Sequence, residues 1–168
     1  MAYWLKRLAR PLLCRVPGRF RPLWLLPGKP RFTFWDAASG LPPGTEVLVA
    51  PRTALLDLAW ALDRDTAPLP EIHRAIVVRS DRWQGLLTEE DRDLLWDVFG
   101  VPVFEQFTAP DGRVVAFECE AHAGLHLAGD PQALAGMPGA IETSPCECGR
   151  PESRFMPQPP AEVASAAD

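Results

Sequence analysis

Three cysteines and two histidines in the second half of the chain are of the residue types that bind metal ions. Cys119, His122 and His126 lie together in the stretch ECEAHAGLH, and Cys146 and Cys148 follow in PCECGR. Three thiolates and one imidazole make up the ligand set of a closed tetrahedral zinc site. The three cysteines and one of the two histidines therefore predict a structural zinc ion.

The local sequence favours His126 over His122 as the fourth ligand. His126 follows an apolar leucine and begins a new segment, whereas His122 lies close to Cys119 in a more polar environment. Three thiolates, a neutral imidazole and Zn²⁺ sum to a net charge of −1, which Arg150 could partly offset. Gly149 has no Cβ, so we expect the chain to curl there and to aim backbone N–H groups at the sulfur atoms.

Other uses of these thiols stay open on the sequence alone. They could be ordinary buried cysteines, a redox pair, or one catalytic cysteine with its neighbours. A C-x-C pair is a poorer redox motif than C-x-x-C, and a disulfide across it would be strained. A catalytic cysteine needs one activated thiol and a set of oxyanion donors, which the sequence does not suggest. Zinc binding is the interpretation we prefer.

The composition is that of a water-soluble globular chain of one domain with appendages. Of the 168 residues, 47% are apolar and 23% charged, and no apolar run reaches the roughly 18–20 residues of a membrane span. The four cysteines with their tight C-x-C, and the lack of a recognisable signal peptide, predict a cytoplasmic protein without disulfides.

Charge divides the chain into parts. Eight of the 17 basic residues precede Asp36, the first acidic residue, which leaves nine against 22 acidic residues and a net charge of −13 for the rest. We therefore expect a basic, aromatic-rich arm over 1–35, an α/β body with the zinc site over 36–155, and a disordered tail over 156–168. The arm could fold back onto the acidic body, or contact nucleic acid or an anionic membrane surface. Any protein partner is unknown.

The first regular elements read as a strand, a helix and a second strand. The apolar run at 46–50 predicts a strand, and the β-branched run at 75–79 predicts another that is buried on both faces. Between them, Thr53 is the expected N-cap of a helix. Apolar residues with helical spacing follow it, namely Leu55, Leu58, Ala59 and Leu62.

The clearest element is a helix that begins after Thr88. Asp91 lies three residues later, as in a variant of the capping box, and Gly100 is placed to end the helix. Its expected buried face consists of Leu94, Leu95, Val98 and Phe99. The stretch VPVF then predicts a third strand, and RVVAFE predicts a fourth after the turn APDG. Alternating strands and helices with short connections predict an α/β fold: a small, mainly parallel sheet with flanking helices and a Cys3His zinc-stabilised end.

Several of these stretches also carry a family resemblance. LTEEDRDLLWDVFG, ECEAHAGLH and CECGR together resemble the phenylacetate–CoA ligase group of adenylate-forming enzymes, and GTEVLVAPRTALLDLAWAL is similar to an upstream strand and helix of that group. The likeness spans 44–150, and its two cysteine segments are the most specific part. For this chain the resemblance implies a structural zinc ion bound by Cys119, His126, Cys146 and Cys148.

The resemblance does not extend to the motifs that carry the reaction. The Ser/Thr/Gly-rich ATP loop and the C-terminal catalytic domain are not found. FEQFTAPDG replaces the motif whose glutamate binds Mg²⁺, and Asp130 lies too near His126 for the ribose-binding aspartate. We therefore expect no catalytic or cofactor-binding residues and a non-catalytic zinc-binding remnant that serves as a binding or scaffold module. The alternatives are a subunit of a split acyl-adenylate/CoA ligase and a nucleic-acid-binding protein that uses the arm over 1–35.

Overall fold

A computed structural model of the chain describes residues 30–35, 41, 43–64 and 72–158. Most of the predicted arm and most of the predicted tail lie outside these residues. No helix in the described part is long and apolar enough to cross a membrane.

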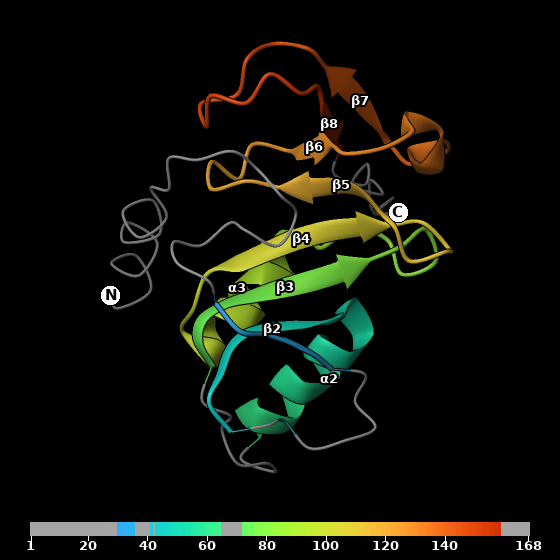
Figure 1. The fold of residues 1–168 in the computed structure, drawn as a ribbon. Coiled ribbons are helices and arrows are strands. Elements are labelled where there is room, and N and C mark those ends of the chain that lie inside the picture. Colours follow the sequence, from blue (N-terminus) through green and yellow to red (C-terminus); the bar gives the residue numbers. More distant parts are fainter. Residues whose placement is uncertain (1–29, 36–40, 42, 65–71, 159–168) are drawn as a thin grey trace, which may run out of the picture.

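The described residues form one eight-stranded sheet with two α-helices (Figure 1). The strand order is β1-β2-β3-β4-β5-β6-β8-β7. A short 3-10 helix, η2, follows β6. The bounds are β1 Phe32–Phe34, β2 Thr45–Pro51, α2 Arg52–Asp63, β3 Ile72–Ser80, α3 Glu89–Phe99, β4 Val103–Thr108, β5 Val114–Glu118, β6 Leu125–Leu127, η2 Pro131–Leu134, β7 Gly139–Glu142 and β8 Arg154–Pro157.

The prediction of an α/β fold is confirmed, but the prediction of a mainly parallel sheet is wrong. Strands β1 to β4 are parallel, whereas β4, β5, β6, β8 and β7 pair in antiparallel fashion, so the sheet is mixed. The reason lies in the turn at 109–113 between β4 and β5. A parallel pair needs a crossover of a dozen or more residues, and a turn this short can only reverse the chain.

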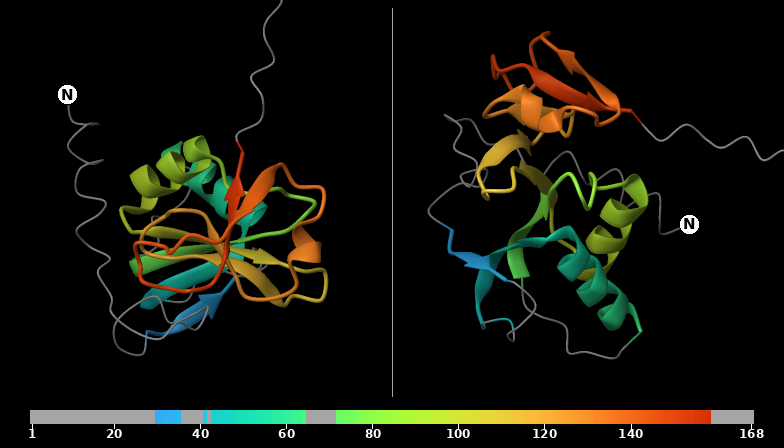
Figure 2. Two further views of the ribbon diagram at one scale, coloured as in Figure 1. Left: turned by 90° about the horizontal axis from the view of Figure 1, so that it is seen from above. Right: turned by 90° about the vertical axis from the view of Figure 1, so that its right-hand side faces the viewer.

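Both α-helices cover the same face of the parallel half (Figure 2). Crossovers between parallel strands are right-handed, and the chain moves in one direction from β2 to β3 to β4, so α2 and α3 must fall on one side. Leu55 of α2 and Leu95 of α3 pack there against Leu48 and Ile76 of the sheet, and all four side chains are fully buried.

The start and end of α3 follow the predicted pattern. The Thr88 hydroxyl accepts a hydrogen bond from the Asp91 N–H at 3.2 Å, and an Asp91 carboxylate oxygen accepts one from the Thr88 N–H at 3.1 Å. Gly100 has a φ of 66° and closes the helix by donating its N–H to the carbonyl of Trp96 at 2.8 Å. Both predicted ends of this helix are confirmed.

The predicted N-cap of α2 is wrong. The helix begins at Arg52, and Pro51 is its N-cap residue, with no side-chain capping hydrogen bond. The Thr53 N–H instead donates to the side-chain oxygen of Gln84 at 3.3 Å. A residue that lies beyond β3 therefore meets one of the free N–H groups of the helix, a role that no local pattern could predict.

We expect Thr88→Ala to reduce the free energy of unfolding by about 1 kcal/mol, because it removes a capping hydrogen bond. Thr53→Ala is the matched control and should leave stability nearly unchanged, since the Thr53 side chain caps nothing. Urea denaturation of the two variants and the parent protein measures both effects. Equal losses in the two variants would contradict this account of the helix ends.

Candidate metal centre

The antiparallel half of the sheet brings together the four residues that the sequence analysis predicts as metal ligands. Cys119 directly follows β5, His126 lies in β6, and Cys146 and Cys148 lie in the loop between β7 and β8. Figure 1 shows these strands side by side at the end of the molecule away from α2. One ligand atom from each of the four residues lies within 4.8 Å of the other three, so the group could hold a metal ion.

The spacing of the donor atoms matches a tetrahedral ion. The sulfur atoms of Cys119 and Cys146 are 3.7 Å apart, and the Cys148 sulfur lies 3.3 Å from Nε2 of His126. Metal–ligand bonds of about 2.3 Å for sulfur and about 2.0 Å for nitrogen put tetrahedral ligand atoms roughly 3.5–3.8 Å apart. A disulfide would need about 2.0 Å. The three thiols are free, and the 3.7 Å between the sulfur atoms of Cys119 and Cys146 is the distance expected for two ligands of one ion.

Backbone N–H groups tend to lower the pKa of all three thiols. The N–H of Ala121 acts on Cys119, that of Cys148 on Cys146, and that of Arg150 on Cys148. Gly149 stands between two of these donors with a φ of 78°, which residues with a side chain rarely adopt. The expected curl at this glycine is present, and the N–H donors favour thiolates over thiols.

Burial sets the protonation of the donor atoms. It raises the pKa of Cys119 and Cys148 above the usual thiol value. At Cys146 burial has the same tendency, but hydrogen bonds from the Cys148 N–H and from neighbouring thiols outweigh it and lower the pKa. Burial also lowers the pKa of His126, and the Arg150 charge adds to that effect. The lowered pKa favours the neutral imidazole, which is the form that binds a metal ion. The raised pKa values mean that Cys119 and Cys148 become thiolates only when a cation lies close to them.

Strand pairing fixes the orientation of His126. Its ring stacks on that of Phe117, the residue opposite it in β5, at a centroid distance of 5.4 Å. Nε2 faces the sulfur of Cys148, and Nδ1 lies 4.0 Å from a carboxylate oxygen of Glu152. Nδ1 is buried and has no direct hydrogen-bond partner among the described residues, so strand pairing and the stacking on Phe117 hold the ring.

Arg154 holds the two ligand segments together, and sequence reasoning missed it. It lies in β8 opposite His126 and is 6% exposed. One guanidinium nitrogen donates to the carbonyl of Ala123 at 2.7 Å, and the other donates to the Ser144 hydroxyl at 3.2 Å and lies 3.3 Å from the Glu142 carboxylate. The role of Arg154 depends on the pairing of β6 with β8, for which the sequence carries no local signal.

His122 has a different role from His126. Its Nδ1 is 2.8 Å from the Glu118 carboxylate, and its ring stacks on that of Phe104 at a centroid distance of 5.2 Å. It does not belong to the group of four metal donors. The sequence-based choice of His126 over His122 therefore agrees with the geometry.

A buried ionic network joins α3 to the strand that leads into the metal centre. A guanidinium nitrogen of Arg92 is 2.9 Å from the Glu118 carboxylate, and the other is 3.5 Å from that of Glu105. Glu118 also accepts the backbone N–H of Glu105 at 3.0 Å and directly precedes the ligand Cys119. The network thus connects the helical half of the molecule to the Cys3His group.

The pKa values of the two carboxyl groups in the network shift in opposite directions. Burial tends to raise the pKa of Glu118, but the charge of Arg92 and the hydrogen bond with His122 outweigh it and the pKa is lowered. Burial raises the pKa of Glu105 in spite of hydrogen bonds from Ser80 and from the Leu87 N–H. For Arg92, burial tends to lower the pKa, but the two carboxylates outweigh it and the pKa is raised. Arg92 and Glu118 therefore form the charged pair at the centre of the network.

A comparison of the chain with protein-family models finds no match, and a comparison with curated proteins finds none either. The fold and the site alone define the class of protein. It is a mixed α/β domain with a Cys3His group that could hold a metal ion.

We expect Arg92→Met to reduce the free energy of unfolding by about 3–5 kcal/mol, because it leaves the Glu118 carboxylate buried without its cation. Arg113→Met is the control: Arg113 pairs with Asp111 at the surface, so its replacement should have no measurable effect. Urea denaturation of both variants measures the difference. A loss below about 1 kcal/mol at Arg92 would show that the network does not hold the two halves together.

Proposed function

We propose that the Cys3His group binds one zinc ion and that this ion is structural. Thiolate and imidazole donors in a tetrahedral arrangement are the preferred ligands of Zn²⁺, whereas Mg²⁺ and Ca²⁺ prefer oxygen. Four protein donors complete the coordination shell and leave no position for substrate or water. The observation that carries this proposal is the close approach of the four donor atoms, which come from segments far apart in the sequence.

The protein as a whole, in this proposal, is a non-catalytic binding or scaffold module derived from an adenylate-forming fold. The two segments that converge at the metal centre are those that carry the resemblance to the phenylacetate–CoA ligase group, ECEAHAGLH and CECGR. A zinc ion at that end would have the same place in the chain as the structural zinc of that group. This coincidence supports the proposed kinship.

The surroundings of Glu105 and Glu118 support a binding role over the adenylation reaction. Adenylation needs cationic groups and Mg²⁺ to neutralise a triphosphate. The stretch FEQFTAPDG stands where the Mg²⁺-binding motif of the group would be, and its Phe104 and Glu105 side chains are buried. Glu105 and Glu118 both face the Arg92 guanidinium inside the molecule. These carboxylates serve the packing of the domain.

Zinc would act by stabilising the half of the sheet that α2 and α3 do not cover. The core there is small and centres on Phe107, Leu125 and Phe155. Apparent binding free energies of structural zinc ions are about 10–16 kcal/mol in small domains. Even a fraction of that energy is comparable to the total stability of a typical domain, about 5–15 kcal/mol.

We expect protein purified without added metal to contain one zinc ion per chain, and His126→Ala to reduce that content strongly. His122→Ala is the matched control, because His122 bonds to Glu118 outside the donor group, and it should keep its zinc. Mass spectrometry under native conditions and elemental analysis measure the metal. Removal of zinc by a chelator should lower the melting temperature of the parent protein by roughly 10 °C or more, as expected for a loss of a few kcal/mol.

A folded parent protein that holds no metal would overturn the zinc proposal. Equal zinc content in the His126→Ala and His122→Ala variants would overturn the assignment of the ligands. Both results are read from the metal itself, so neither depends on knowing what the module binds.

The non-catalytic role has its own test. We expect ATP with Mg²⁺ to leave the melting temperature unchanged, since a ligand that binds the folded state would raise it. We also expect no exchange of pyrophosphate into ATP in the presence of carboxylic acids. A stabilising effect of ATP, or exchange that appears when a second protein is added, would instead favour the subunit of a split ligase.

A further inference from the structure

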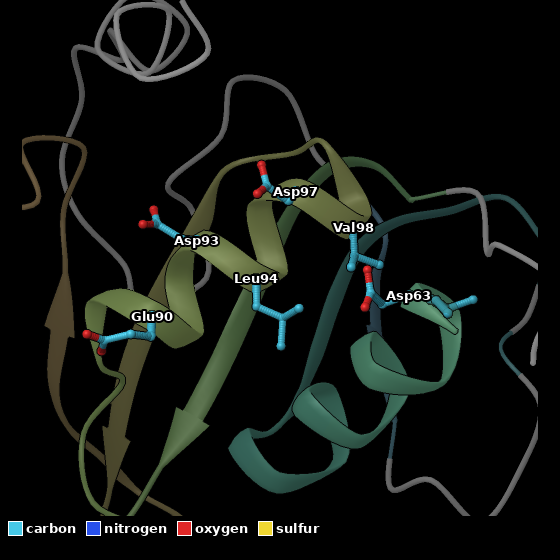
Figure 3. A pocket seen from close by; sticks show the side chains of 7 residues that line it. Asp63, Glu90, Asp93, Leu94, Asp97 and Val98 are labelled. Carbon is cyan, nitrogen blue, oxygen red and sulfur yellow. The ribbon is translucent and has the colours of Figure 1, made fainter. Parts of the chain in front are cut away.

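A hollow of about 560 Å³ lies between α2 and α3, on the side of the helices away from the sheet (Figure 3). Three of its lining side chains are apolar and four are acidic. They are Leu62, Leu94 and Val98, and Asp63, Glu90, Asp93 and Asp97. An occupant that suits this lining needs both an apolar face and several positive charges.

The apolar part of the hollow is surface that the sequence predicts to be buried. Leu94 and Val98 belong to the expected buried face of α3, yet both are only partly buried, whereas Leu95 of the same face is completely buried. Figure 3 shows Leu94 and Val98 on the side of α3 that faces α2. The helices do not close over these two side chains, and covering them would be favourable.

The acidic residues stand where a helix disfavours them. Asp63 lies in the last turn of α2 and Asp97 in the last turn of α3, and neither helix has a basic residue in its last turn. The C-terminus of a helix carries a partial negative charge, so carboxylates there are unfavourable and cations are favoured. Arg64, which follows Asp63, donates to the carbonyl of Trp60 at 3.2 Å. A cation from elsewhere is therefore attracted by both helix ends as well as by the carboxylates.

The spacing of the acids on α3 suits a helical occupant. Glu90, Asp93 and Asp97 follow one another at intervals of three and four residues, so they form a row along one side of the helix. Glu90 and Asp97 are about 10 Å apart along the axis, at roughly 1.5 Å per residue. A second helix with basic residues at the same intervals can face all three acids at once.

We infer that the hollow is the docking surface for the basic segment of the same chain, residues 1–29. That segment holds seven basic residues and no acidic one, and the described body around the hollow is acidic. In WLKRLAR, Lys6 and Arg10 are four residues apart, as are Trp4 and Leu8. The sequence therefore supplies positive charges and apolar side chains at the intervals that the hollow requires, and attachment to the same chain gives it a high effective concentration.

Zero-length crosslinking with a carbodiimide tests this inference on the full-length protein. Lys6 and Lys29 are the only lysines of the chain, so an amide between a lysine and an acid of the hollow must come from residues 1–29. We expect peptides that join Lys6 to Glu90, Asp93 or Asp97 in mass spectra. Their yield should fall at least about fivefold in 1 M salt, where charges more than roughly 3 Å apart are screened.

Three double variants sharpen the test. Asp93→Asn with Asp97→Asn should shift crosslinking away from α3, whereas Asp57→Asn with Asp111→Asn removes two acids outside the hollow and should change nothing. Arg7→Glu with Arg10→Glu leaves the described body untouched and should shift the NMR signals of the Leu94 and Val98 methyl groups. Unchanged methyl signals in that variant would overturn the inference.

The crosslinks also identify the source of the docked segment. In a mixture of isotope-labelled and unlabelled protein, docking within one chain gives only peptides of a single label. Peptides of mixed label would overturn docking within one chain and assign the hollow to a second copy. Crosslinks of Lys6 spread evenly over acids elsewhere, or none at all while the carboxylates react with the reagent, would overturn the docking surface itself.

Discussion

Three thiols and one imidazole lie within 4.8 Å of one another, and the proposed function depends on this constraint more than on any other. Burial keeps a proton on Cys119 and Cys148 unless a positive charge lies close by. A divalent cation removes this cost and turns crowded polar atoms into ligands. In the proposed function, a bound zinc ion gives the half of the sheet without α-helices a strong interaction in place of a large core.

Arg92 connects the antiparallel half of the sheet to the half that α2 and α3 cover. This residue belongs to α3, yet its guanidinium lies between two strands, against Glu105 of β4 and Glu118 of β5. Those strands are the junction between the parallel and the antiparallel part of the sheet. Glu118 directly precedes Cys119, so the ion pair connects α3 to the strand that carries the first residue of the Cys3His group. A buried ion pair adds little net stability but fixes geometry, which is the role it has here.

Local patterns in the sequence predicted those features that local interactions produce. The capping box of Thr88 and Asp91 involves residues one helical turn apart, so the sequence alone predicts it. The choice of His126 rested on the change from polar to apolar surroundings. The antiparallel half of the sheet was not predicted, although the turn after β4 is too short for a crossover to a parallel strand. Arg154 was missed because its partners, Ala123 and Ser144, come close only after β8 has paired with β6.

The arrangement separates stability from recognition. The Cys3His group lies at the end formed by β5 to β8, while the acidic hollow lies between the two helices on the parallel half. A structural ion has no open position for a partner, so recognition must use side chains elsewhere. The hollow offers what an interaction surface needs, namely partly exposed Leu94 and Val98 beside a row of carboxylates. If the Cys3His group holds the proposed zinc ion and the hollow binds the proposed segment, stability and recognition depend on different residues of the domain.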